Sequence, residues 1–106
     1  MSSVERQRID LEVSELLVDE RKEAYLKAEK DVEYGDILEV LLGEPHFFVL
    51  NRGRSTRFNM LGPNRSGRYL LTAIAQVEGQ RWRVITAHWL DQRRGRRDYE
   101  GGLADG

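Results

Sequence analysis

The sequence contains no cysteine in 106 residues. Disulfide scaffolds, cysteine zinc sites and thiol catalysis are therefore excluded, and a reducing compartment is expected. Long apolar runs are also missing, because the longest covers Phe47–Leu50, whereas a membrane helix needs about 20 residues. The first residues, Met1 to Arg6, lack the apolar segment that a secretory signal requires. We therefore expect a cytoplasmic protein that makes no contact with a membrane.

Lysine is absent from the second half of the chain, although arginine is abundant there. Residues 1–50 carry 6 Lys and Arg against 13 Asp and Glu, a balance of −7. Residues 51–100 carry 11 Arg against 4 Asp and Glu, a balance of +7, and Asp105 brings the net charge to −1. Because arginine makes bidentate contacts with phosphate, this asymmetry favours an anion-binding face. The alternative is a solvated surface whose charge only neutralises the acidic half.

The length and the apolar periodicity predict one α+β domain over residues 1–100, with a disordered tail over residues 101–106. Alternation indicates a first strand over Ile9–Val13, and helical spacing indicates two helices over residues 20–30 and 33–42. An antiparallel meander of about four strands should follow, over residues 46–50, 55–61, 68–77 and 81–86.

A short C-terminal helix over residues 92–100 completes the predicted fold, with Asp91 as its cap and Gly95 weakening its middle. In the last strand, Arg81 and Arg83 should share one face, opposite Trp82 and Val84. Helices that are segregated from antiparallel strands argue for a two-layer α+β domain.

Two patterns suggest chemistry that their surroundings do not support. Residues 62–69 have the glycine spacing of a phosphate-binding P-loop, but Arg68 and Tyr69 replace its Lys and its Ser or Thr, and a strand follows instead of a helix. His46 and His88 lack carboxylates at ligand spacing, so no metal and no other cofactor is expected.

Three segments of the second half resemble a known family. They read Gly67-Arg68-Tyr69-Leu70-Leu71, then Arg83-Val84-Ile85-Thr86-Ala87, then Arg96-Arg97-Asp98-Tyr99-Glu100. They are similar to the C-terminal half of BrnT-type toxins, which are small ribonucleases related to the RelE fold, and the resemblance covers about residues 16–100. It implies the toxin component of a bacterial type II toxin–antitoxin pair, with RNA and an antitoxin protein as partners, and it leaves a homodimer open.

The resemblance also implies an endoribonuclease that needs no metal and uses the ribose 2′-OH as nucleophile. Such chemistry requires cations beside the reacting phosphate and groups that transfer protons. The candidate catalytic residues are Arg68, Arg83, His88 and Tyr99, with Arg68, Arg81 and Arg83 expected to converge on one phosphate. His88 is the acid or base, because its unperturbed pKa is about 6.5, and Tyr99 would stack on a base or donate a hydrogen bond. Further RNA phosphate contacts are expected from Arg54, Arg57, Arg65, Arg81, Arg96 and Arg97.

Four positions depart from the family pattern. Lys30 stands where the family has a histidine, Asp31 where it has a glycine, His88 where it has an arginine, and Gly95 where it has a glutamate. These departures keep a second hypothesis open, a non-catalytic BrnT-like module that binds nucleic acid or a partner protein through an arginine-rich sheet face. For each candidate a structural role remains the alternative: a solvent face for Arg81 and Arg83, and packing for His88 and Tyr99.

Overall fold

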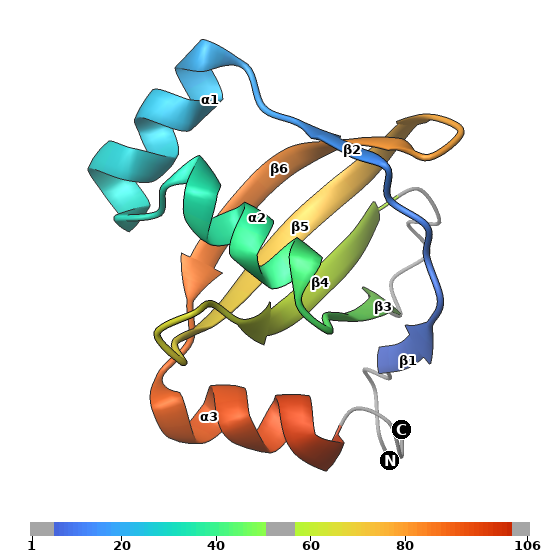
Figure 1. The fold of residues 1–106 in the computed structure, drawn as a ribbon, viewed down its shortest axis with the longest axis vertical. Helices are drawn as coiled ribbons and strands as arrows, with labels where there is room; N and C mark the ends of the chain where they lie inside the picture. Colours follow the sequence, from blue (N-terminus) through green and yellow to red (C-terminus); the bar gives the residue numbers. More distant parts are fainter. Residues whose placement is uncertain (1–5, 51–56, 103–106) are drawn as a thin grey trace.

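The computed structural model describes residues 6–50 and 57–102 and shows an α+β fold built on a mixed sheet (Figure 1). The six strands lie in the order β1-β3-β4-β5-β6-β2, and all neighbours are antiparallel except β2 and β6, which are parallel. The strands are β1 (Arg6–Ile9), β2 (Glu15–Leu17), β3 (His46–Leu50), β4 (Arg57–Pro63), β5 (Tyr69–Glu78) and β6 (Arg81–Trp89). The helical segments are α1 (Glu20–Tyr25), η1 (Leu26–Lys30), α2 (Tyr34–Leu42), α3 (Gln92–Arg97) and η2 (Asp98–Gly102).

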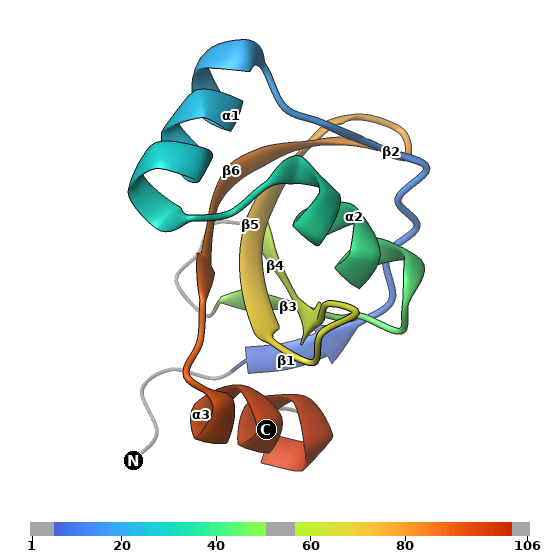
Figure 2. The same cartoon turned by 60° about the vertical axis from the view of Figure 1, so that its left-hand side comes forward.

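The first strand predicted from the sequence is two strands at opposite edges of the sheet. β1 pairs with β3, with Ile9 opposite Phe47, and β2 pairs with β6, with Leu16 opposite Trp82. Residues 10–14, here called the strap, connect them. Five strand spacings would separate the two edges of a flat sheet by about 24 Å. The six peptide units from Ile9 to Glu15 reach at most about 21 Å, so the sheet must curl, as Figure 2 shows.

The helices after β2 begin and end where local chemistry requires. The Asp19 side chain caps α1 by accepting a hydrogen bond of 2.7 Å from the Lys22 backbone N–H. The single helix predicted over residues 20–30 continues as the π-helix η1, which ends at Asp31 in the left-handed region with φ 57°. A capping box of Glu33 and Asp36 starts α2.

The main core lies between the sheet and the layer of α1, η1 and α2. Ile37 and Val40 of α2 and Leu26 of η1 are buried there, and β6 contributes Trp82 and Val84. These apolar side chains recur every three or four residues on the helices and every second residue on the strand, so each element turns one face inward. The sequence predicts this alternation for the start of β6. For α2 it predicts a face of Ile37, Leu38, Leu41 and Leu42, which is wrong at Leu42, because that side chain is 81% exposed and Val40 is buried instead.

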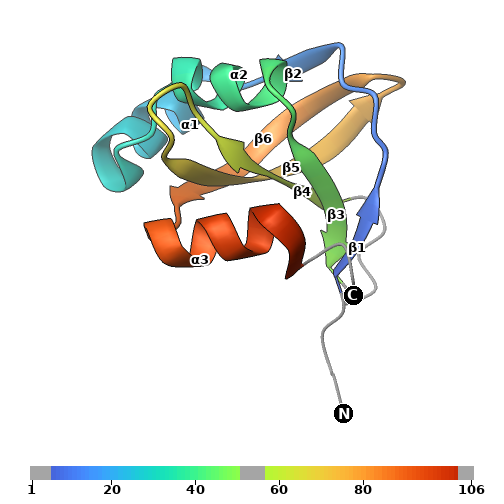
Figure 3. The same cartoon turned by 60° about the horizontal axis from the view of Figure 1, so that its bottom comes forward.

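The third helix lies on the other face of the sheet, so the predicted two-layer arrangement is wrong (Figure 3). Gly95 of α3 is buried against Tyr69 of β5, and a second core under α3 contains Phe48 and Leu61. Gly95 therefore permits close packing as well as weakening the helix. None of the helices within the described residues is long and apolar enough to cross a membrane.

Several predicted boundaries shift in the structure. β4 begins at Arg57 and not at Ser55, and β6 extends to Trp89. Gly101 and Gly102, which had been assigned to a disordered tail, complete η2, and residues 103–106 of that tail lie outside the described residues.

Candidate nucleic-acid interface

The arginines of β6 lie on the sheet face that also carries α3. Arg81 and Arg83 are exposed, whereas Trp82 and Val84 between and after them are buried in the main core, as the alternation predicted. The pairing of β5 with β6 shifts by one residue between Ala73 and Ile74. At this point β6 therefore contains one extra residue that has no partner on β5. This bulge places Thr86 and His88 on the same side as Arg83, because Ala87 is buried in the main core.

Two cationic side chains flank a small one in the middle of this face. Arg57 of β4 pairs with Ala75 of β5, and Ala75 pairs with Arg83 of β6. Two strand spacings put the Cα atoms of the two arginines about 10 Å apart. We call Arg57, Ala75 and Arg83 the arginine row. Ala75 is itself 6% exposed and its short side chain does not separate the two longer ones, so the two guanidinium groups can converge on one anion.

Polar side chains follow the arginine row toward α3. Asn59, Ala73 and Thr86 form the next row across β4, β5 and β6, and Leu61, Leu71 and His88 form the one after it. Asn59 is 7% exposed, and Thr86 is half-buried. We call the residues Arg57, Ala75, Arg83, Asn59, Ala73, Thr86 and His88 the open face; Leu61 and Leu71 of the third row do not belong to it, because they pack in the second core under α3. Along the strands His88 lies about 13 Å from the arginine row, too far for both to contact a single phosphate.

The surroundings of His88, at one end of the open face, favour its neutral form. Partial burial lowers its pKa below the ordinary value of 6.5, and the positive charges of Lys30 and Arg94 lower it further. A neutral imidazole offers one nitrogen that accepts a proton. His88 can therefore act as a base beside two cations that favour an anion.

The acidic first half does not neutralise the arginine row. Among the described residues, one ion pair joins the two halves of the chain. It runs from Arg81 to Glu15, with 2.9 Å between Nε and Oε1. Arg57 and Arg83 have no ion-pair partner within the described part of the chain. The acidic residues of α1, η1 and α2 lie in the layer on the opposite face of the sheet (Figure 2).

The arginines of α3 are largely paired within their own helical segment. Arg94 and Arg97 both approach Asp98 at 3.5 Å, and Arg96 lies 3.2 Å from Glu100. Arg81 is likewise engaged, with Glu15 at 2.9 Å and Glu78 at 3.8 Å. Arg81, Arg96 and Arg97, predicted as phosphate contacts, therefore have carboxylate partners that an RNA would have to displace.

The predicted convergence of Arg68, Arg81 and Arg83 on one phosphate is wrong. The Arg68 guanidinium lies 4.0 Å from the centre of the Trp89 ring, and the Trp89 indole donates a hydrogen bond of 2.9 Å to the Asp31 carbonyl on the main-core side. Arg68 directly precedes the first residue of β5. Arg81 pairs with Glu78, which is the last residue of β5. Ten residues of strand separate the two arginines by about 30 Å.

Tyr99 is part of the packing under α3. Its hydroxyl donates a hydrogen bond of 2.7 Å to the Glu44 carbonyl, and its ring stacks on His46 with centroids 4.3 Å apart. The His46 Nε2 atom lies 2.7 Å from the Tyr99 carbonyl oxygen. The hydroxyl and one face of the Tyr99 ring are therefore already engaged within the protein.

The two remaining predicted contacts lie away from the arginine row or outside the described residues. Arg65 is exposed in the loop between β4 and β5, where its backbone N–H donates to Glu39 at 2.9 Å. Arg54 falls within residues 51–56 and lies outside the described part of the chain.

Sequence reasoning missed the neighbours that define the open face. Arg57 had been predicted as an outer contact, but its position opposite Arg83 across Ala75 depends on strand register. Thr86 had been assigned to the predicted strand without a role, and the bulge that turns it to the open face has no local sequence signal. The contribution of Lys30 and Arg94 to His88 depends on tertiary packing.

Within residues 6–50 and 57–102, no three His, Asp or Glu side chains gather as metal ligands.

Comparison of the chain with protein-family models, curated proteins and solved structures finds no match.

Proposed function

We propose that this protein binds RNA along the open face, as the toxin-type member of a bacterial toxin–antitoxin pair. The observation that carries the proposal is the arginine row, in which two exposed guanidinium groups without ion-pair partners in the described structure flank a small alanine. Such a pair suits a phosphate group, because each guanidinium presents parallel N–H donors to two oxygens.

The polar row beside the arginines suits the same ligand. Thr86 offers a hydroxyl and Asn59 an amide, and both groups can bond phosphate or ribose oxygens. The distance of about 13 Å from the arginine row to His88 is suited to a strand of more than one nucleotide that runs along β6. Contacts of this kind give affinity and salt dependence, with little base specificity.

The placement of the resembling segments supports the toxin-type part of the proposal. The three segments that resemble BrnT-type toxins lie at the start of β5, in β6 and across α3 and η2, so that two neighbouring strands and the terminal helical segment carry them. An antitoxin in this proposal would cover the open face with acidic side chains. RNA and such an antitoxin would then compete for Arg57 and Arg83.

A non-catalytic RNA-binding module is the second candidate, and two observations favour it. Arg68 lies against Trp89 on the other face, and the Tyr99 hydroxyl is bonded to the Glu44 carbonyl. Of the predicted catalytic residues, Arg83 and His88 remain on the open face, and they do not reach one phosphate together. Cleavage would require His88 to act as a base with cations other than the arginine row.

Binding of a fluorescein-labelled single-stranded RNA, followed by anisotropy over a range of salt concentrations, tests the proposal. Replacing Arg57 and Arg83 together by Gln should weaken binding and lower the slope of log K against log salt by about 1.4, since each phosphate contact contributes about 0.7. The matched control replaces Arg21 and Lys27 in the acidic layer by Gln, which removes the same charge. Equal losses in the two variants would contradict binding at the open face.

Inducible expression in bacteria separates the toxin from the module. Growth arrest with loss of intact RNA, relieved by His88→Gln in a protein that still binds RNA, indicates cleavage. Unimpaired growth at high expression, with RNA binding retained in vitro, indicates the non-catalytic module.

A further inference from the structure

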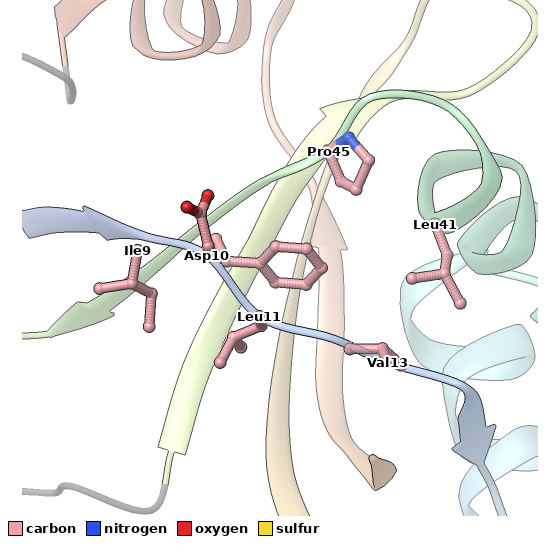
Figure 4. A pocket seen from close by; sticks show the side chains of 7 residues that line it. Ile9, Asp10, Leu11, Val13, Leu41 and Pro45 are labelled. Carbon is pink, nitrogen blue, oxygen red and sulfur yellow. The ribbon is translucent and has the colours of Figure 1, made fainter.

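A second concave site lies on the far side of the molecule from the open face. It is a pocket of about 320 Å³, lined mostly by apolar residues and by the polar backbone between them, that opens to solvent between the strap, the end of α2 and β3 (Figure 4). Its lining residues are Ile9, Asp10, Leu11, Val13, Leu41, Pro45 and Phe47. Val13 of the strap and Leu41 of α2 face each other across the opening in this view.

The apolar lining is incompletely covered by the protein itself. Leu11, Val13 and Leu41 pack against the main core, but each stays partly accessible to solvent. Leu42, the next residue of α2, does not line the pocket and is 81% exposed, the highest value among the large hydrophobic side chains that the structure describes as exposed. Apolar side chains that stay accessible to solvent are typical of interaction sites when they gather with a polar rim.

The strap also offers an extended backbone that belongs to no strand. Residues 10–13 lie between β1 and β2 without strand pairing, while apolar side chains alternate with Asp10 and Glu12 along them. Within the described residues, the backbone hydrogen bond of this stretch is the one from the Trp82 indole to the Glu12 carbonyl, at 3.2 Å. An added extended peptide could therefore bond to it, as in β-strand addition.

The rim of the pocket is negatively charged. The exposed carboxylate of Asp10 lines the pocket and has no ion-pair partner within the described chain. Apolar side chains with a carboxylate at their edge are complementary to an apolar side chain that is followed by a cationic one.

We propose that this pocket binds an extended peptide segment of a partner protein, with one apolar anchor residue in the pocket and a neighbouring Lys or Arg beside Asp10. The anchor gains affinity by removing the apolar lining from water, and the cation fixes the direction in which the peptide lies. The site is independent of the arginine row, since the two lie on opposite faces of the sheet.

The probe is a fluorescein-labelled peptide of sequence Lys-Val-Leu-Lys-Val, titrated with the full chain and followed by anisotropy. Asp10→Lys should weaken binding at least tenfold, because it places a repelling charge at an exposed position. Glu29→Lys, the same change of charge on the exposed surface of η1, should alter it less than twofold. Methyl resonances of Leu11, Val13 and Leu41 should shift on titration, and RNA should not compete with the peptide.

Three results would overturn the proposal. The first is equal binding to a peptide in which Glu replaces both Lys residues, and the second is equal binding by the Asp10→Lys variant. The third is a concentration-dependent dimer in sedimentation velocity that Asp10→Lys abolishes, because the pocket would then be a contact between two copies of this chain. A methyl spectrum of each variant serves as the control that the variant is folded.

Discussion

Gly95 of α3 lies so close to Tyr69 of β5 that a Cβ atom at position 95 would be 2.6 Å from the Tyr69 Cγ atom. The nearest tyrosine atom that it would meet is Cβ, whose position is set by the backbone of the strand. The missing side chain therefore allows α3 to lie on the sheet. The resemblance to BrnT-type toxins would place a glutamate at this position, and this packing leaves no room for one.

Gly95→Ala should destabilise the protein by about 1–3 kcal/mol, the usual cost of forcing extra atoms into a packed core. Alanine is the better helix former by about 1 kcal/mol, so a net loss shows that the contact with Tyr69 outweighs propensity. Gly35→Ala in α2 is the control, because a Cβ there meets nothing within 4 Å. Urea unfolding should show a loss for the first variant and a small gain for the second, and gains for both would contradict the packing.

Ala75→Glu should lower the affinity for RNA more than the replacement of either Arg57 or Arg83 alone. The new carboxylate would lie between Arg57 and Arg83, pair with both and repel a phosphate. RNA affinity should fall at least tenfold, while Ala75→Gln, which has nearly the same size without the charge, should bind more tightly than Ala75→Glu. Similar affinities for these two variants in the anisotropy assay would mean that no phosphate lies above Ala75.

The helices and the central strands could be predicted because their signals are local. Asp19 and Asp91 cap helices as predicted, and Pro45 marks the change from α2 to β3. The alternation of Arg83 with Val84 also predicts which side chains of β6 are exposed in the part of the strand that precedes the bulge. In each case a few neighbouring residues carry the information.

The candidate site could be predicted only in part, because register and layer are long-range properties. Nothing near Arg57 in the sequence shows that it lies opposite Arg83, and the stacking of Arg68 on Trp89 requires β5 and β6 to be paired. The apolar alternation from Ile9 to Val13 is typical of a strand. In the structure the same alternation directs side chains from the strap into the main core and the pocket, with no strand beside it.

His88 should make the protein less stable as the pH falls. Burial, Lys30 and Arg94 lower its pKa in the folded state, so the unfolded chain takes up the proton first. The free energy of unfolding therefore falls as the pH drops from about 6.5 toward the folded pKa, and this loss is complete below it. His88→Gln should remove this part of the pH dependence, measured by urea unfolding between pH 5 and pH 8. Parallel curves for both proteins would contradict the lowered pKa.

Glu15→Gln should have opposite effects on stability and on RNA binding. The pair with Arg81 is about half-exposed on both sides, so its loss should cost only about 0.2–1 kcal/mol and less at high salt. The same change leaves Arg81, two residues from Arg83 on the same face, with only the longer contact of 3.8 Å to the exposed Glu78 within the described residues. RNA affinity should therefore rise, and the slope of log K against log salt should steepen by up to about 0.7.

The Arg81→Gln variant and the double variant close this thermodynamic cycle. If Glu15 acts on RNA through Arg81, Glu15→Gln should raise the affinity in the wild-type background and change it much less when Arg81 is already Gln. A rise of the same size in both backgrounds would show that Glu15 repels RNA directly as a charge. Arg81 would then remain outside the RNA footprint, and the binding surface would be limited to the arginine row and its neighbours toward α3.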